Sequence, residues 1–237
     1  MEACRLTLIP AGHEAVRTYK PRRGRVTATQ ATALARSWSR LGVHIPFVEE
    51  QARPLDLAAL FGRRAPVVLE IGSGMGEATA AMAAADPGRD VLAVDVHTPG
   101  LGNLIKLVEA TGLTNVRVAD GDALVLLRAM LSPGSLDEVR VFFPDPWPKG
   151  RHAKRRLVTP AFADLVASRL TCGGRLHIAT DWEPYAVAVR LILGAHPHFT
   201  LLDGGFSPPP IPRPITRFER QAAVAGRRVA DVLAMRR

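Results

Sequence analysis

The residues best suited to chemistry lie just after a predicted buried strand, in residues 142–149. Asp145 stands there between Pro144 and Pro146, and flanking prolines reduce the entropy lost when a carboxylate is held still. Trp147 follows, and its ring is expected to stack on a nucleobase. The next residues form a dense group of cations, namely Arg151, His152, Lys154, Arg155 and Arg156. One interpretation is that Asp145 and these cations simply neutralise one another, but the proline–acid–proline–tryptophan order favours a ligand or reaction site.

A second candidate site comes earlier in the chain, where glycines follow another predicted strand. Gly72, Gly74 and Gly76 lie between the strand over residues 67–71 and a helix. Residues without a Cβ let the backbone approach a ligand closely. Asp95 ends the next predicted strand, 23 residues after Gly72. A carboxylate at that point can accept both hydrogen bonds from a ribose diol, so the pattern favours a nucleoside site over a plain turn.

The glycine spacing and a nearby acid distinguish between nucleoside cofactors. Dinucleotide sites use G-x-G-x-x-G and place a pyrophosphate at a helix N-terminus, whereas this chain has G-x-G-x-G. Glu70 precedes the glycines, where its charge would repel a phosphate and attract an ammonium group. These features favour S-adenosylmethionine (AdoMet), which is cationic and carries no phosphate. Asp122 is expected to accept from the adenine amino group, to cap the helix that follows, or to do both.

The frame for these residues is predicted by apolar runs that alternate with helix-like segments. Strands are expected over 67–71, 91–95, 116–119, 139–143 and 174–180, and helices over 29–41, 77–85, 100–110, 123–130, 160–170 and 183–193. This alternation predicts an α/β fold with a parallel sheet covered on both faces. Residues 1–65 are expected to be a basic arm with a helix, and residues 66–237 the catalytic domain. Repeated prolines predict an exposed loop over residues 207–214.

The charge of the chain is uneven. The sequence has 237 residues, of which 47% are hydrophobic, and a formal net charge of +9. Residues 1–64 carry +6, residues 65–144 carry −5, and residues 145–156 and 202–237 carry +4 each. Normal apolar content argues against a disordered chain. Basic segments around an acidic middle indicate an anionic partner such as nucleic acid.

Other totals exclude whole classes of protein. Cys4 and Cys172 are the two cysteines, too few for a disulfide framework or a cysteine-rich zinc site. No run of about 18 apolar residues predicts a transmembrane helix, and residues 1–10 lack the apolar core of a signal peptide. We therefore expect a cytoplasmic protein without a metal or a membrane partner. Nothing in the sequence sets the oligomeric state, and a monomer is favoured.

Several blocks of the sequence resemble one known family. Residues 142–157, FFPDPWPKGRHAKRRL, closely resemble the signature of bacterial tRNA (guanine-N7-)-methyltransferases, and residues 69–76 are similar to the cofactor loop of that family. Residues 179–186 and 216–219 look like two further family blocks, and residues 22–27 resemble its basic arm. The resemblance covers nearly the whole chain. It implies a Rossmann-like class I methyltransferase fold with a mostly parallel, doubly wound sheet.

The resemblance also implies roles for individual residues. Asp145 matches the residue that is treated as catalytic in the family. Asp145, Glu70, Asp95 and Asp122 together match the acids that bind AdoMet. Gly72 and Gly74 belong to the same cofactor site. Substrate-binding positions are matched by Lys149, Asp181, Thr216, Arg217, Phe218 and Glu219, and the RNA-contacting segment by Arg151, His152, Lys154, Arg155 and Arg156. The implied reaction moves a methyl group from AdoMet to N7 of guanosine 46 in the variable loop of tRNA, which leaves S-adenosylhomocysteine.

The chain departs from the family pattern at three places, and other functions stay open. Asp95 stands where glutamate is more usual, residues 148–150 replace a more basic stretch, and the residues beside Asp231 lack an expected aromatic. One alternative is another AdoMet-dependent methyltransferase that acts on RNA or on an amine. Another is a non-catalytic RNA-binding protein with a vestigial cofactor pocket. A nicotinamide dehydrogenase is disfavoured by the glycine spacing.

Overall fold

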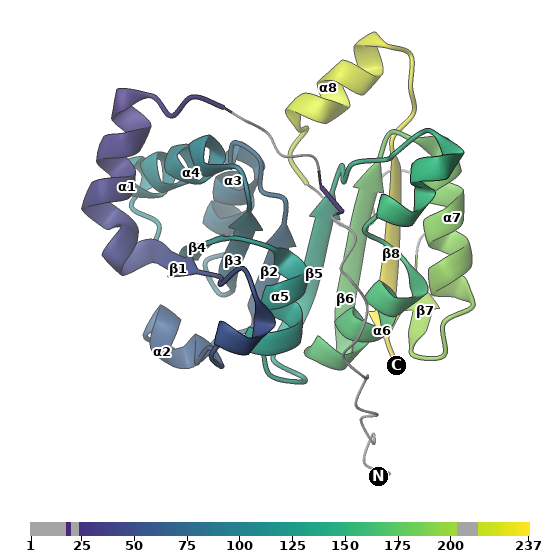
Figure 1. The fold of residues 1–237 in the computed structure, drawn as a ribbon, viewed down its shortest axis with the longest axis horizontal. Coiled ribbons are helices and arrows are strands. Elements are labelled where there is room, and N and C mark those ends of the chain that lie inside the picture. Colours follow the sequence, from purple (N-terminus) through teal and green to yellow (C-terminus); the bar gives the residue numbers. More distant parts are fainter. Residues whose placement is uncertain (1–17, 20–23, 203–212) are drawn as a thin grey trace.

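Short apolar runs form the strands of one mixed sheet (Figure 1). In residues 18–19, 24–202 and 213–237, which the computed structural model describes, eight strands lie in the order β1-β4-β3-β2-β5-β6-β8-β7. They are β1 (Gly42–His44), β2 (Val67–Ile71), β3 (Asp90–Asp95), β4 (Val116–Asp120), β5 (Leu136–Phe142), β6 (Leu170–Thr180), β7 (Phe199–Leu201) and β8 (Ala230–Arg236). Strand β8 is antiparallel to β6 and β7, and the remaining pairs are parallel.

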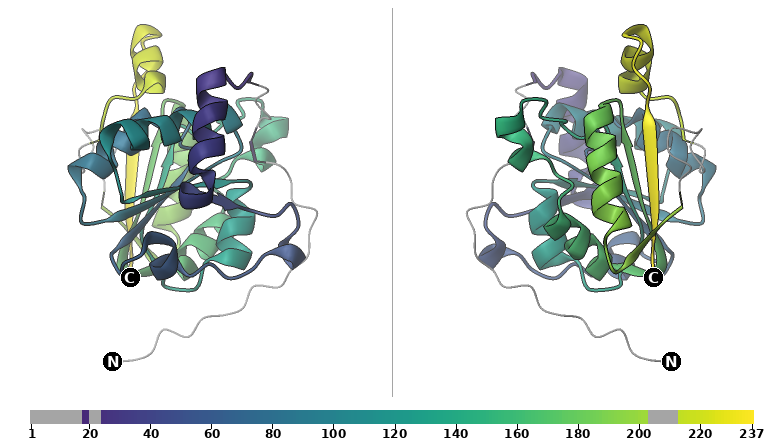
Figure 2. Two further views of the ribbon diagram at one scale, coloured as in Figure 1. Left: turned by 90° about the vertical axis from the view of Figure 1, so that its left-hand side faces the viewer. Right: turned by 90° about the vertical axis from the view of Figure 1, so that its right-hand side faces the viewer.

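The central strands are buried on both faces, as their continuous apolar runs require. In β2, Val68 belongs to an apolar cluster with Leu104 of α4 (Thr98–Thr111), whereas Leu69 on the opposite face belongs to a second cluster with Val166 of α6 (Pro160–Arg169). Helices therefore cover both sides of the sheet (Figure 2). This arrangement confirms the predicted doubly wound α/β fold.

The helices occupy the stretches between strands, with several shorter ones outside the pattern. They are α1 (Ala28–Leu41), η1 (Glu49–Gln51), α2 (Leu57–Phe61), α3 (Glu77–Ala85), α4 (Thr98–Thr111), α5 (Ala123–Val125), the π-helical η2 (Leu126–Met130), η3 (Gly150–Arg155), α6 (Pro160–Arg169), α7 (Glu183–Gly194) and α8 (Arg217–Val224). In the described part of the chain, no helix combines the length and the apolarity that a membrane crossing requires.

Residues 24–65 are built onto the same sheet. Strand β1 pairs with β4 in parallel, and Ile45 donates a backbone hydrogen bond to Asp120. Helix α1 lies against α4, where Arg36 forms a 2.5 Å ion pair with Glu109. The guanidinium of Arg36 lowers the pKa of Glu109 to about 2. The division of the chain at residue 65 stays a prediction. Most of the basic run over residues 17–25 and of the loop over 207–214 lies outside the described residues.

The predicted elements all occur, and the differences have local causes. The helix expected over 123–130 becomes π-helical from Leu126, where the hydrogen bond from Leu131 closes on Leu126. The strand expected over 139–143 ends one residue earlier, because Phe143 has a left-handed φ of 53°. The sequence patterns did not indicate β1, α2, β7 or α8.

Candidate active site

A pocket opens at the C-terminal ends of β2, β3, β4 and β5, where parallel sheets bind ligands. It holds about 890 Å³ of empty space, a figure that includes the solvent at its mouth. Its lining brings together both stretches that the sequence singles out. Among the lining residues are Gly72, Gly74, Asp95, Asp122, Asp145 and Phe218.

The glycine loop forms one wall of the pocket. Gly72 and Gly74 have left-handed φ values of 82° and 58°, which strain any residue with a side chain. No atom lies within 4 Å of the place where a Cβ would stand at either glycine. The backbone itself therefore faces open space in the pocket. Below the loop, Gly100 of α4 is close enough that a Cβ would lie 1.9 Å from the carbonyl oxygen of Gly74, a requirement that sequence reasoning missed.

Asp95 connects the glycine loop to the end of β3. Its Oδ2 accepts a hydrogen bond from the amide of Gly74 at 2.8 Å, and its Oδ1 accepts from the amide of His97 at 2.9 Å. Each carboxylate oxygen can accept a further hydrogen bond. Asp95 thus fixes the loop and still presents acceptors to the pocket.

Glu70 lies beneath the loop and is not among the pocket-lining residues. Its side chain is buried, and Oε1 accepts a hydrogen bond from Thr79 at 2.9 Å. Oε2 has no hydrogen-bond partner. Burial raises the pKa of Glu70, and the nearby charge of Arg140 offsets this only in part. An unpartnered carboxylate oxygen next to the pocket is suited to a cationic or hydrogen-bonding ligand.

Asp122 has the capping role that was one of its two predicted functions. It is the N-cap of α5, and its side chain accepts from the amide of Leu124 at 2.8 Å. It also lines the pocket, on the side of β4. One oxygen therefore holds the helix start, and the residue remains within reach of a ligand.

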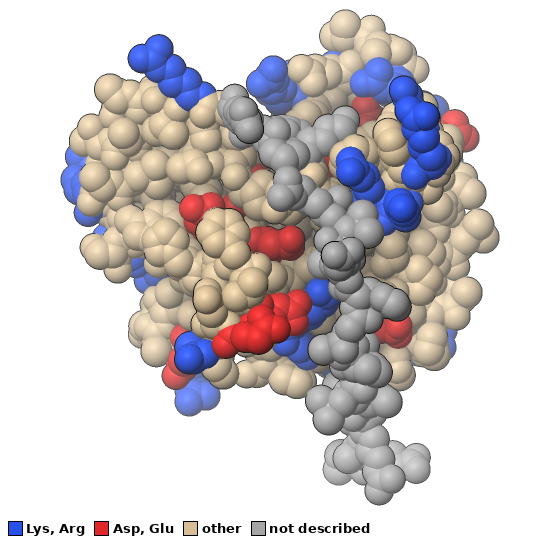
Figure 3. Space-filling view, in the orientation of Figure 1, with Lys and Arg blue, Asp and Glu red and all other residues tan. Residues whose placement is uncertain are grey.

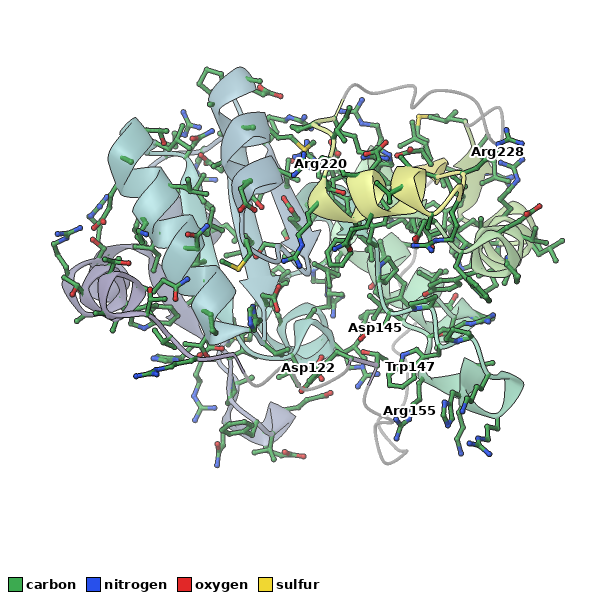
Figure 4. All side chains as sticks on the ribbon, turned by 90° about the horizontal axis from the view of Figure 1, so that it is seen from above. Asp122, Asp145, Trp147, Arg155, Arg220 and Arg228 are labelled. Carbon is green, nitrogen blue, oxygen red and sulfur yellow. The ribbon has the colours of Figure 1, made fainter. Side chains whose placement is uncertain are left out.

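The stretch after β5 carries strained backbone at two aromatic residues. Phe143 and Trp147 have φ values of 53° and 44°, which are uncommon for residues other than glycine. Asp145 lies between them and lines the pocket (Figure 4). Phe143 stacks on Phe218 of α8 with ring centroids 5.7 Å apart. Strain that clusters beside a carboxylate is typical of functional sites.

Trp147 is buried rather than presented to a base. Its side chain is 6% exposed, and its Nε1 donates to the carbonyl of Thr18 at 3.2 Å. The guanidinium of Arg155 lies 4.8 Å from the centre of its ring. In this conformation Trp147 is therefore not placed to stack on a base, the role that the sequence predicted.

The basic segment around η3 divides into exposed and inward residues. Lys149, Arg151, Lys154 and Arg155 are exposed, and His152 is half-buried with its ring edge against Trp147. Arg156 turns inward, where it donates to the carbonyl of Pro146 at 3.0 Å and packs on the ring of Tyr185. Figure 3 shows Lys and Arg side chains gathered over this part of the molecule.

The predicted substrate-binding residues are mostly engaged with other protein groups. Asp181 forms a 2.9 Å ion pair with Arg227. Thr216 caps α8 by accepting from the amide of Glu219. Arg217 is exposed, whereas Phe218 lines the pocket.

A buried ionic cluster behind the pocket was not found from the sequence. Arg213 is 2% exposed and donates to both oxygens of Asp231 at 2.8 and 2.9 Å, and to Glu219 at 2.5 Å. His177 completes the cluster, with Nε2 2.7 Å from Asp231. Although burial acts to raise it, the pKa of Asp231 is lowered, because His177 and Arg213 share hydrogen bonds with it. Arg213 also packs over Phe142 and Phe143.

The described residues provide no alternative site for a metal. Among them, no three or more His, Cys, Asp or Glu side chains are grouped to hold a metal ion.

Comparison with known proteins gives consistent matches. A family model described as "Putative methyltransferase" matches residues 64–232. The chain is 56% identical to a "tRNA (guanine-N(7)-)-methyltransferase" of Streptomyces coelicolor, over 94% of this chain and 83% of that protein. It is 49% identical to a protein of the same name from Halorhodospira halophila, over 92% of this chain and 93% of that one.

Solved structures share the fold at low identity. An rRNA methylase from Streptococcus thermophilus is 17% identical with a TM-score of 0.50, over 73% of this chain and 87% of that one. A 30S ribosomal methyltransferase from an uncultured bacterium is 12% identical with a TM-score of 0.52, over 78% of this chain and 96% of that one. At these identities the likeness concerns the fold alone, and it agrees with the predicted Rossmann-like class I architecture.

Proposed function

The chain belongs to the tRNA (guanine-N7-)-methyltransferase family, and from this premise we propose that it methylates N7 of a guanosine in tRNA with AdoMet as the methyl donor. Guanosine 46 of the variable loop is the proposed target, as the resemblance of residues 142–157 implies. A tRNA substrate also implies that the enzyme works in the cytoplasm. The observation that carries the proposal is that one pocket contains Asp95 and the glycine loop on one wall and Asp145 on the other.

The residues of the pocket fit AdoMet. The glycine loop leaves open space for a ligand against its backbone, and Asp95 retains acceptors for a ribose diol. The unpartnered Oε2 of Glu70, next to the glycine loop, would favour the ammonium group of AdoMet. Asp122 would accept a hydrogen bond from the adenine amino group. When bound, AdoMet supplies an electrophilic methyl group on a sulfonium.

The chemistry required of the protein is positioning and charge stabilisation. Guanine N7 has an in-plane lone pair, so no base is needed to remove a proton first. Methylation leaves positive charge on the imidazole ring, and a carboxylate nearby becomes more favourable as that charge develops. We assign this role to Asp145, which the adjacent prolines hold in place. Phe143 and Phe218 would exclude water and limit the orientation of the base.

The exposed cations would bind the phosphates of tRNA. Lys149, Arg151, Lys154 and Arg155 face solvent next to the pocket, and His152 lies among them. The role proposed for Asp181 is to accept from the Watson–Crick edge of guanine. That role requires the base to share or displace the ion pair with Arg227. Arg156 would act indirectly, by holding the backbone at Pro146.

The decisive experiment uses unmodified tRNA and labelled AdoMet, followed by nucleoside analysis. We expect N7-methylguanosine, and its absence from a guanosine-46→adenosine tRNA would confirm the position. Another methylated nucleoside would favour a different RNA methyltransferase. RNA binding without methyl transfer would favour a non-catalytic RNA-binding protein.

Asp145→Asn tests the assignment of the carboxylate. We expect the single-turnover rate to fall on the order of 100-fold, because one preorganised electrostatic contact to the transition state is lost. AdoMet and tRNA affinities, measured by calorimetry and anisotropy, identify any loss that reflects binding. Glu50→Gln removes an exposed carboxylate elsewhere and serves as the control. An unchanged rate in Asp145→Asn would rule out the role.

A further inference from the structure

Helix α8 stands away from the rest of the molecule. It projects beyond the C-terminal ends of the strands (Figure 2), and Ala222 is the one buried residue among its eight. Burial of a single alanine gives little hydrophobic stabilisation. The position of α8 therefore depends on other contacts, and its exposed surface is available to a partner.

The helix is anchored by its acidic residue, which leaves its outer surface basic. Glu219 is paired with buried Arg213 at 2.5 Å, and it is the only acidic residue between residues 213 and 229. Arg217 and Arg220 are exposed on α8, and Arg228 is exposed just after it. The inward pairing of Glu219 thus separates the charges, with the anion toward the body and the cations outward.

The cations of α8 lie on the opposite side of the reaction pocket from those of η3. In Figure 4, seen from above, Arg220 and Arg228 lie on one side of Asp145, whereas Trp147 and Arg155 lie on the other. Phe218 of the same helix lines the pocket. A base that enters this pocket would carry its backbone across the mouth, with phosphates on both sides. An arginine binds phosphate in two-point geometry as well as by charge.

An apolar partner is less suited to this surface. The exposed apolar residues here are Ile215, 65% exposed, and Val224, 91% exposed. Ile215 precedes α8 and Val224 is its last residue, so among the described residues these two side chains form no continuous patch of the kind that protein interfaces use. The charge pattern favours an RNA backbone.

We infer that α8 and the turn to Arg228 form a second phosphate-binding surface, distinct from residues 149–156. It would hold the RNA strand on the far side of the target nucleotide, so that the base is fixed from both directions. The inference rests on the proposed function for the identity of the RNA.

Single charge reversals test this surface. The variants are Arg220→Glu and Arg228→Glu, and the probe is unmodified tRNA at about 50 to 200 mM salt, read by anisotropy. We expect each variant to lose about tenfold or more in affinity, and the slope of log affinity against log salt to fall by about 1. Arg64→Glu is the matched control, since Arg64 is exposed just before β2, near the N-terminal end of that strand and so away from the pocket. Its reversal should change affinity less than about threefold, as a remote charge acts only through screened potential.

Further measurements separate the possible outcomes. Circular dichroism and AdoMet calorimetry show whether each variant is folded, and Arg220→Gln is a milder second variant in case Arg220→Glu is not. If the folded Arg220 and Arg228 variants bind tRNA with wild-type affinity and wild-type salt slope, the inference is overturned. The proposed function is still intact in that case, provided that the native enzyme methylates tRNA. The inference would likewise be overturned if these variants lost the binding of a protein partner but bound tRNA as the native enzyme does. If the native enzyme does not form N7-methylguanosine, a selective loss of RNA affinity in these variants would still support the surface.

Discussion

The two walls of the pocket are held in place by different kinds of contact. On the β2–β4 side, Asp95 and Asp122 accept hydrogen bonds from nearby backbone amides, and the loop after β2 is shaped by glycine. On the β5–β8 side, side chains distant in sequence hold one another, as Arg213 holds Asp231 and Glu219. The cofactor wall is thus positioned by local hydrogen bonds, and the acceptor wall by a buried ionic cluster. Substitutions should therefore have local effects on the first and distributed effects on the second.

Arg213→Met should have the largest effect, because it leaves buried carboxylates without their partner. We expect a loss of about 3–5 kcal/mol in the free energy of unfolding, measured by urea denaturation at neutral pH. The loss should shrink on acidification. The folded-state pKa of Asp231 is lowered, so its stabilising contribution is present above its unfolded pKa and disappears as pH falls through the folded value.

Arg213→Lys is the control for this change, because it retains a charge but not the two-point geometry. It should recover part of the stability and less of the tRNA methylation rate, since Phe143 and Phe218 depend on the position of the guanidinium. Equal stability of the Met variant and the native protein would contradict the distinction between the two walls.

Asp95→Ala should have an intermediate effect confined to the cofactor. We expect AdoMet affinity to weaken about 10- to 100-fold in calorimetry, because hydrogen bonds to a charged group are lost and the loop loses its anchor. The affinity for tRNA should stay within about twofold, since the sites are independent. Asp95→Glu is the control, as it preserves the carboxylate. A comparable loss of tRNA affinity in Asp95→Ala would show that the walls are coupled.

Glu70→Gln should have the smallest effect and the opposite sign. Burial raises the folded-state pKa of Glu70 above its unfolded value, so ionisation of this group lowers stability as pH rises through the folded pKa. Without AdoMet, the variant should unfold at a higher urea concentration than the native protein near pH 8, and at the same concentration near pH 4. Calorimetry should show weaker AdoMet binding by the variant. A stability difference that does not vary with pH would refute this interpretation.

The same distinction explains what the sequence could predict. Apolar residues fill most of β2 and β3, so the burial of these strands is visible in the residues themselves. In β8, Asp231 and Arg236 interrupt the apolar pattern, and both are buried. Asp231 pairs with His177 and Arg213, and Arg236 donates a hydrogen bond to the carbonyl of Leu170. The partners of Asp231 lie 18 and 54 residues away, which no local pattern indicates.

The candidate site divides in the same way. Asp95, Asp122 and Asp145 follow strands directly, so sequence alone places them at one edge of the sheet, and all three line the pocket. Arg213 follows a proline-rich stretch that indicated only a loop. The pairing of Asp181 with Arg227, and the inward turn of Arg156, likewise depend on tertiary contacts.

The place of β8 in the sheet has a consequence for the order in which the protein can assemble. Among the described strands, β8 is synthesised last, yet it lies between β6 and β7. During translation, β7 therefore cannot reach its final position until the ribosome has delivered residues 230–236. Until then Arg213, which anchors α8 through Glu219, lacks its second partner, Asp231. A nascent chain could form the AdoMet wall early, but it would gain the wall for RNA only after β8 has been synthesised.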